Sequence, residues 1–309
     1  MVDLRQLRHF IAVADTLHFG RAAERLCMTQ PPLSQSIMAL ERELGADLFA
    51  RSKRIVTLTA FGHQWLEHVR PAVKGVAALA DIAESLRTGR AGRLSLAFVS
   101  TADYSVLPTL VQKYSEQFPG VALELVEATS DVQIDALLHE EIHAGILIAA
   151  PSALPNALTY SPLFTEELVA AVPELWIESG RLALADGRLR SNDWMAQPLI
   201  IFPKRVSPDF HELVMGFYKA RGYLPFTQQE AIQMQTIISL VSAGLGMALV
   251  PASLQHLART GVRYLPIAGK VPKLETGLAW RKADDAPTLA ALIEIAGNLD
   301  VIRTELHGS

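Results

Sequence analysis

Residues 29–58 read TQPPLSQSIMALERELGADLFARSKRIVTL, and this stretch decides the fold of the first part of the chain. Its apolar residues recur at steps of four, three and four, which predicts one buried face of a helix: Leu33, Ile37, Leu40 and Leu44. Thr29 is a typical N-cap, Gly45 is a typical C-cap, and the two prolines are tolerated in a first turn. Residues 49–51 and 55–58 then predict a short hairpin.

Two amphipathic stretches precede this helix, at 4–14 and 19–26, so three helices and a hairpin occupy the first 58 residues. This is the arrangement of a winged helix-turn-helix, whose third helix enters the major groove of DNA. Glutamine pairs with adenine, serine donates or accepts, and methionine contacts the thymine methyl group. The candidate DNA contacts of the third helix are Gln30, Pro31, Pro32, Ser34, Gln35, Met38 and Arg42.

The hairpin loop, or wing, adds a basic cluster suited to phosphate contacts: Arg51, Lys53 and Arg54. A helical bundle with a polar outer face would account for the three helices alone, and the basic cluster favours DNA binding over that alternative. The net charge of −4 argues against a nucleic-acid binder only until it is divided along the chain. Residues 1–90 hold 12 Lys and Arg against 9 Asp and Glu, whereas residues 91–309 hold 16 against 23.

A long helical pattern follows, from residue 59 to about residue 88. Its apolar stripe comprises Trp65, Leu66, Val69, Val73, Val76, Leu79, Ile82 and Leu86. A helix of this length spans roughly 45 Å at 1.5 Å per residue. A head of 58 residues is too small to cover that stripe, so we expect a partner helix; a core helix of one large domain is the alternative. Pro71 is expected to kink or split the helix, and TGRAG at 88–92 predicts a flexible joint.

From residue 93 onward the pattern changes to alternating strands and helices, which predicts an α/β body with mainly parallel sheets. About 217 residues are enough for two lobes, and parallel sheets bind ligands at a crevice beyond the carboxyl ends of their strands. The uncharged segment 231–255 is long enough for a membrane span, but its glutamines, glycines and proline favour a helix, a turn and a buried strand.

The sequence carries no recognised catalytic motif, so we expect no enzyme, no metal site and no cofactor. The single cysteine, Cys27, excludes an internal disulfide framework and is expected to be a buried structural thiol. Nothing resembles a signal peptide, and we expect a cytoplasmic protein.

The whole chain resembles a LysR-type transcriptional regulator. The resemblance rests on LRQLRHFIAVADTLHFGRAAERL at 4–26, TQPPLSQSIMALERELGADLF at 29–49 and TLTAFG at 57–62, each at the spacing of the family. It continues in LPTLVQKYSEQFPGVALELVEATSDVQIDALL at 107–138 and IISLVSAGLGMALVPAS at 237–253. Within the family, the body is most similar to regulators of aromatic-compound catabolism.

The resemblance implies a transcriptional regulator that forms dimers through the linker helix, commonly paired into tetramers, and binds a promoter inverted repeat in double-stranded DNA. RNA polymerase is a further candidate partner. A small-molecule effector would enter the cleft of a two-lobed body that resembles a periplasmic binding protein. The implied effector contacts are Ser100, Thr101, Thr129, Phe202 and Pro203. Hydroxyls and helix N-termini favour an anion, so we expect the effector to be an organic acid, and an aromatic acid is one candidate. The alternative is that these hydroxyls only cap their helices.

Two departures from the family pattern are visible. Ile146-Leu147-Ile148 stands where aromatic-responsive relatives carry an arginine, which makes recognition of a second carboxylate doubtful. Gln35, Met38 and Ala39 stand where relatives often carry basic residues, so the recognition helix has a weaker electrostatic hold on DNA.

We therefore expect a DNA-binding domain at 1–58, a dimerising linker helix with its hinge at 59–91, and an effector-binding domain at 92–309. Lobe I would comprise about 92–161 and 268–309, and lobe II about 162–267. The alternative function is a small-molecule binding protein whose head serves protein association.

Overall fold

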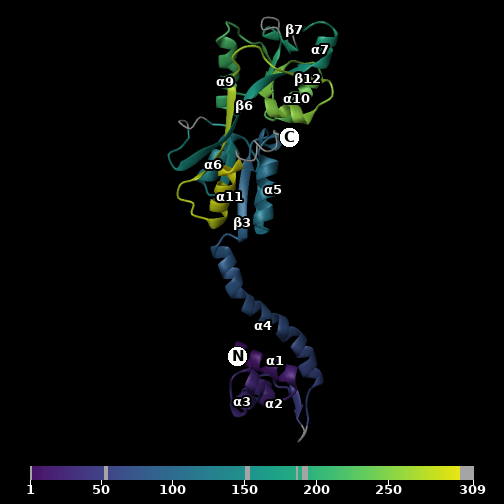
Figure 1. Cartoon of the computed structure of the whole chain (residues 1–309), viewed down its shortest axis with the longest axis vertical. Coiled ribbons are helices and arrows are strands. Elements are labelled where there is room, and N and C mark those ends of the chain that lie inside the picture. The colour runs from purple at the N-terminus through teal and green to yellow at the C-terminus, as the bar shows by residue number, and fades with distance from the viewer. Residues whose placement is uncertain (1, 52–54, 150–153, 186, 190–193, 300–309) are drawn as a thin grey trace. The chain divides into compact units, whose positions relative to one another are not determined.

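The computed structural model describes residues 2–51, 55–149, 154–185, 187–189 and 194–299 (Figure 1). It divides into two compact units, Met1–Glu84 and Ser85–Ser309, which are described separately below. No helix within the described residues is both long enough and apolar enough to cross a membrane.

The first unit contains the predicted three helices and hairpin. Its elements are α1 (Leu4–Thr16), α2 (Phe19–Arg25), α3 (Gln30–Leu44), β1 (Phe49–Arg51), β2 (Val56–Leu58) and α4 (Ala60–Arg87), the last of which runs on into the second unit. Phe10, Val13, Leu33, Ile37 and Leu40 are fully buried at its centre, as the apolar spacing of α3 predicts.

The ends of α3 fall where the sequence predicts them. Thr29 occupies the N-cap position with an extended backbone, although its hydroxyl makes no capping hydrogen bond. Gly45 ends the helix with φ at +69°, a left-handed conformation that glycine adopts at little cost. The expectation of a buried Cys27 is wrong: α2 ends at Arg25, and Cys27 is exposed in the following turn with φ at +54°.

The start of the wing is fixed to α3 by Glu41. This side chain is buried, and its Oε1 accepts backbone N–H bonds from Leu48 at 3.0 Å and Phe49 at 3.2 Å. On the other side, the first turn of α4 approaches the same backbone at Gly62. A Cβ at that position would lie 2.2 Å from the carbonyl oxygen of Leu48, so only glycine fits there. The glycine of the TLTAFG motif thus sets the contact between wing and linker helix.

Helix α4 divides its apolar stripe between burial and solvent. Trp65 lies 5.0 Å from Phe10 between ring centroids, and Val69 is buried, so the first turns complete the core of the head. Farther along, Val76, Leu79, Ile82 and Leu86 are 44–58% exposed within the chain. The helix continues unbroken through Pro71, so the predicted split does not occur. Since Pro71 is exposed, water can reach the carbonyl that lacks its donor.

The second unit is built on a seven-stranded sheet in the order β11-β6-β13-β5-β3-β4, with β12 also paired to β6. Its strands are β3 (Ala91–Phe98), β4 (Gly120–Glu127), β5 (Ala144–Leu147), β6 (Leu158–Pro173), β11 (Ala248–Pro251), β12 (Val262–Leu265) and β13 (Lys273–Arg281). Two small sheets pair β9 (Leu199–Ile201) with β10 (Thr227–Glu230) and β7 (Leu184–Ala185) with β8 (Arg188–Leu189).

The expectation of mainly parallel sheets is wrong for this body. Strands β3, β4 and β5 pair in parallel, as do β9 and β10, but every pairing of β6 and β13 is antiparallel. The reason is that β6 and β13 run between the two lobes, and the sequence analysis predicted neither strand (Figure 1). At the crossing, Gly277 faces the Tyr160 ring, which lies 2.3 Å from where a Cβ would stand.

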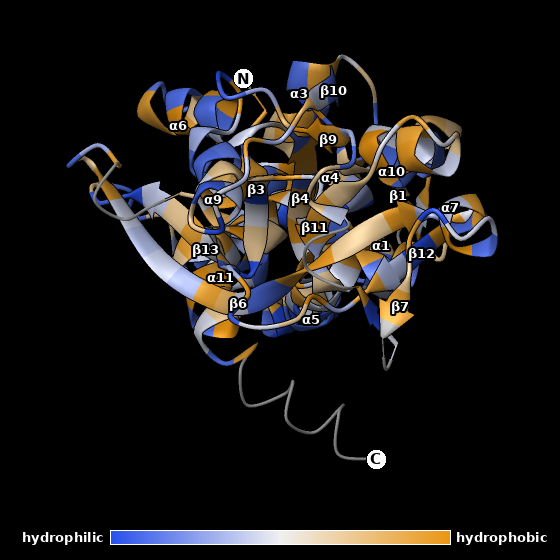
Figure 2. Ribbon diagram, turned by 90° about the horizontal axis from the view of Figure 1, so that it is seen from above, coloured by the Kyte–Doolittle hydropathy of each residue, from blue (hydrophilic) through white to orange (hydrophobic). Residues whose placement is uncertain are grey.

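Helices cover the sheets of both lobes. They are η1 (Ala102–Tyr104), α5 (Leu107–Gln117), α6 (Ser130–Leu138), α7 (Glu174–Glu178), α9 (Pro208–Lys219), α10 (Met234–Ser242), η3 (Ala252–Leu257) and α11 (Pro287–Gly297). In the first lobe α5 packs on α11, and the hydroxyl of Tyr114 donates to the carbonyl of Thr288 at 3.0 Å. Figure 2 shows the hydropathy of each residue along these helices and strands.

Replacing Glu41 should destabilise the head because two buried backbone donors lose a charged acceptor. We expect Glu41→Ala to lower the free energy of unfolding by about 2–4 kcal/mol. Chemical denaturation measures this, and exposed Glu24→Ala, on α2, should change it by less than about 0.5 kcal/mol. Equal, small effects from both variants would contradict the assigned role of Glu41.

Candidate functional site

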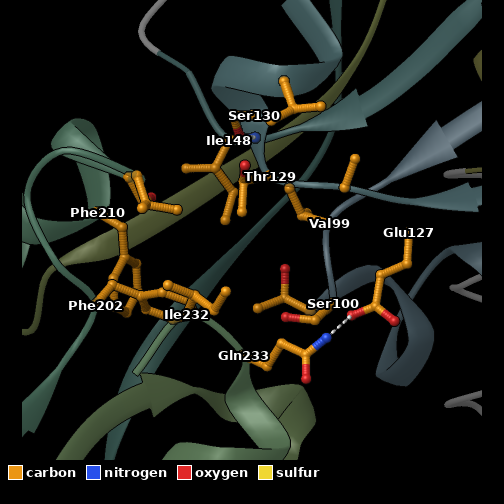
Figure 3. Close-up of a pocket in the computed structure, with 15 residues that line it drawn as sticks. Val99, Ser100, Glu127, Thr129, Ser130, Ile148, Phe202, Phe210, Ile232 and Gln233 are labelled. Carbon is orange, nitrogen blue, oxygen red and sulfur yellow. Dashed lines mark hydrogen bonds between the residues drawn. The ribbon is translucent and has the colours of Figure 1, made fainter. Parts of the chain in front are cut away.

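A cavity of about 290 Å³ lies in the second unit, at the ends of several of its strands (Figure 3). Its lining follows the carboxyl ends of β3, β4, β5, β9 and β10, as the crevice rule for parallel strands predicts. The lining residues are Val99, Ser100, Thr101, Glu127, Ala128, Thr129, Ser130, Val132, Ile148, Phe202, Val206, Ser207, Phe210, Ile232 and Gln233.

Four of the five residues proposed as effector contacts come together here: Ser100, Thr101, Thr129 and Phe202. Pro203 does not line the cavity. It is buried, and its carbonyl accepts the N–H of Val206 at 3.0 Å, so it opens the turn that leads into α9. The sequence indicates a turn at Phe202 and Pro203, but it does not show which of the two residues lines the cavity.

Two helices begin at the cavity without a side-chain cap. Thr129 is the N-cap of α6 and Gln233 the N-cap of α10, and neither side chain bonds to its own helix. Their first-turn N–H groups therefore point positive partial charge at the space between the lobes. Thr129 was expected to hold a ligand or to cap a helix, and its hydroxyl makes no capping bond.

Thr101 contributes a hydroxyl that has no partner among the described residues. Its side chain is 3% exposed and lines the cavity, yet its Oγ1 makes no hydrogen bond. An unpartnered buried hydroxyl costs about 1–3 kcal/mol, which a ligand in the cavity would recover. Ser130, by contrast, already accepts the N–H of Ile148 at 3.2 Å.

The two lobes are joined across the cavity by weak polar contacts. The amide of Gln233 donates to Glu127 at 3.4 Å, and the N–H of Met234 donates to Ser100 at 3.5 Å. Beside the cavity, Gln235 donates to the hydroxyl of Tyr104 at 2.9 Å. The two long bonds, to Glu127 and to Ser100, can be replaced by contacts with a ligand without a large loss.

Most of the wall is apolar. Phe202, Phe210 and Ile232 gather on one side in Figure 3, opposite Glu127. Ile148 lines the cavity where the third body strand ends, so the departure from the arginine of aromatic-responsive relatives falls within the pocket itself. No lysine, arginine or histidine is among the described lining residues. Within the same described part of the chain, no cluster of three metal-ligating side chains occurs.

The outward face of α3 presents the residues expected to contact DNA. Gln30, Pro31, Pro32, Gln35, Met38 and Arg42 are exposed and Ser34 is half-buried. The Nε of Arg42 donates to the carbonyl of Met38 at 3.3 Å, along the same helix. In the wing, Arg51 lies on β1, whereas Lys53 and Arg54 fall outside the described residues.

Two residues that hold this helix in place were missed by the sequence analysis. Glu41 anchors α3 to the wing, and Nδ1 of His9 lies 2.8 Å from Oγ of Ser36. Burial lowers the pKa of His9, with a further contribution from Arg5, and this favours the neutral ring. The sequence feature that could have identified both residues is a polar side chain on the buried face of an amphipathic helix.

Comparison with known families decides the identity of both units. Residues 4–63 match the bacterial regulatory helix-turn-helix protein family of LysR type, and residues 87–299 match the LysR substrate binding domain. The chain is a LysR-type transcriptional regulator. Its relatives are named transcriptional regulators rather than enzymes.

The regulator is 60% identical over 298 residues to the HTH-type transcriptional regulator IlvR of Caulobacter vibrioides, covering 95% of this chain and 97% of that one. It is 36% identical to AlsR of Bacillus subtilis over 98% of each chain. Among solved structures, CbnR, a LysR family regulator, is similar with a TM-score of 0.78 at 30% identity over 96% of this chain and 100% of that one.

CbnR bound to its target DNA is equally similar, with a TM-score of 0.79 at 29% identity over 96% of this chain and 99% of that one. The LysR-type regulator therefore has a DNA-binding head, a helical linker and a two-lobed effector-binding domain. The predicted family, fold class and regulatory function are confirmed. The alternative of a binding protein with a head for protein association is set aside.

The two parts of the DNA-binding face should respond differently to mutation. If Gln30 contacts a base, as the sequence predicts, Gln30→Ala is expected to cost about 1–3 kcal/mol on the cognate promoter and little on random DNA. If Arg54 contacts a phosphate, as the sequence predicts, Arg54→Ala should weaken binding to both DNAs alike. Gel shifts on the promoter and on a scrambled duplex measure the difference, and equal losses for Gln30→Ala on both would contradict its role.

Proposed function

We propose that the cavity between the lobes receives a small organic acid as the effector of this regulator. One observation carries the proposal: the unpartnered Thr101 hydroxyl lies in the same cavity as the uncapped starts of α6 and α10. Each helix N-terminus provides roughly half a positive charge and first-turn N–H donors. Two such termini and a free hydroxyl match one carboxylate.

The cavity supports an acid with a single carboxylate. A second carboxylate would need its own cationic partner, and no described lining residue supplies a guanidinium or an ammonium. The apolar wall of Val99, Ile148, Phe202 and Phe210 suits an aliphatic or aromatic body of modest size.

Thr101→Val tests this assignment because it replaces the hydroxyl with a methyl group of similar size. The free protein should keep or gain stability, since the lost hydroxyl has no partner, whereas binding of the acid should weaken by about 1.5–3 kcal/mol. Thermal shift with a panel of aliphatic, aromatic and amino-substituted carboxylic acids finds the binder, and calorimetry gives its Kd.

Thr276→Val provides a matched control. Thr276 is also buried with an unpartnered hydroxyl, but it does not line the cavity, so this variant should bind the acid normally. If amides or alcohols raise the melting temperature and none of the acids does, the proposal of an organic acid is overturned.

We infer that the regulator associates with itself through the second half of α4. Val76, Leu79, Ile82 and Leu86 form a stripe on one side of the helix, and each is at least 44% exposed within a single chain. Large apolar side chains repeated at helical spacing favour burial against a second helix. A second copy of the same helix supplies a matching stripe in a symmetric dimer.

Leu79→Glu should dissociate this dimer, because it places a charge in the middle of the apolar stripe. Ala77→Glu is the matched control, since Ala77 is exposed and points away from the stripe at 100° per residue. Sedimentation velocity should give a monomer, or a loss of affinity of at least about a hundredfold, for Leu79→Glu alone. A dimer unchanged by Leu79→Glu would contradict the inference.

A dimer presents two heads, which suits a promoter inverted repeat in double-stranded DNA. We propose further that dimers pair into a tetramer, that the regulator contacts RNA polymerase and that it is located in the cytoplasm, as the resemblance to LysR-type regulators implies.

A further inference from the structure

The cavity contains one charged side chain among its described lining residues, and that charge is negative. Glu127, the last residue of β4, lies opposite the cluster of Phe202, Phe210 and Ile232 (Figure 3). Glu127 is exposed, and within the described part of the chain its Oε1 accepts a long bond of 3.4 Å from the amide of Gln233. A carboxylate is an unfavourable neighbour for a simple acid, because like charges at short range repel.

Further negative charge surrounds this position. Burial raises the pKa of Asp103 in η1, and the negative charge of Glu127 raises it further. Asp131 lies in the first turn of α6. Lys204 and Arg205 lie between the lining residues Phe202 and Val206 in the sequence, but they do not line the cavity themselves. Lys204 forms an ion pair with Glu212 at 3.0 Å.

A ligand that carries both a positive and a negative charge therefore matches the groups that line the cavity. Two uncapped helix N-termini and the free Thr101 hydroxyl accommodate one carboxylate. Glu127 lines the same cavity and accommodates one cation. The wall of Val99, Ile148, Phe202 and Phe210 offers nothing polar to the remainder of the ligand.

We propose that the effector is a zwitterion, a small α-amino acid with an apolar side chain, whose ammonium group binds Glu127. This rests on the proposed organic-acid function and narrows it. The α-carbon of such a ligand carries both the ammonium and the carboxylate, so the ammonium can bind Glu127 while the carboxylate faces Thr101 and the helix N-termini, and the side chain extends toward Phe202 and Phe210. The cavity of about 290 Å³ is large enough for an aliphatic or aromatic amino acid.

The test compares two amino acids with their deaminated counterparts on the full-length protein. L-leucine is matched by 4-methylpentanoate, and L-phenylalanine by 3-phenylpropanoate, so each pair differs only in the ammonium group. Calorimetry should give a Kd for one of the amino acids that is about ten- to a hundredfold lower than for its counterpart, the usual worth of a charged hydrogen bond.

Glu127→Gln gives a prediction of opposite sign for the two ligand classes. The amide retains the shape of the side chain and a carbonyl acceptor for Gln233, but it no longer attracts an ammonium. Binding of the amino acid should weaken about ten- to a hundredfold, whereas binding of the deaminated acid should stay equal or improve. Glu116→Gln on α5, an exposed carboxylate outside the cavity, should change neither.

The outcomes separate this inference from the function on which it rests. If the deaminated acids bind as tightly as the amino acids, or if Glu127→Gln weakens both classes equally, the zwitterion is overturned and the organic acid stands. If leucinamide binds and no carboxylate does, both proposals fail. If none of the four probe acids binds, the apolar amino acid is overturned as the effector.

Discussion

The antiparallel pairing of β6 with β13 is the constraint on which the effector domain depends. Strand β6 is sixteen residues long and pairs with β13 from Leu158 to Glu167 before it pairs with β11 and β12. It therefore belongs to the sheets of both lobes. The cavity exists because these strands hold the strand ends of one lobe opposite those of the other. A register shift at Thr276 and Gly277, where Tyr160 closes on the backbone, marks the crossing.

This arrangement determines what an effector can do to the regulator. A ligand changes a conformational balance only by its difference in affinity for the two states. The cavity lining comes from both lobes, so a bound ligand contacts both. The polar contacts between the lobes at this point are long, as at Glu127 with Gln233 and at Ser100 with Met234. Contacts this weak can be exchanged for contacts with a ligand, so ligand binding can change the spacing of the lobes.

Local signals made the head predictable and long-range pairing made the body less so. Helix α3 runs from Gln30 to Leu44 as expected, because its periodicity and both flanking cap positions lie within the stretch itself. Strand β6 was not predicted, since Pro162 and the adjacent Glu166 and Glu167 interrupt its pattern, and its partner β13 lies about a hundred residues away. The parallel strands were found individually, but the antiparallel pair that joins the lobes was invisible in the sequence.

The same contrast applies to the site. Hydroxyls that follow strands were found from the crevice rule and the family resemblance, and Ser100, Thr101 and Thr129 do line the cavity. Glu127 and Gln233 were missed because a charged residue at a strand end and an amide before a helix look like ordinary solvated positions. Only the fold shows that they face each other from different lobes. The residues that give the pocket its charge are thus the ones that the linear sequence hides.

The head presents the complementary case, in which weak charge is itself informative. Arg42 is the one basic side chain among the candidate contacts on α3, and residues 1–90 exceed neutrality by only three charges. Each phosphate that a protein neutralises releases counterions and raises its affinity for DNA, so a head with few basic residues gains little affinity in this way. With the contacts proposed above, Gln30 and Gln35 would supply specificity by base readout, and a dimer joined through α4 would supply affinity by raising the effective concentration of the second head. The apolar stripe of α4 and the modest charge of α3 are therefore parts of one solution to binding DNA with a chain that is acidic overall.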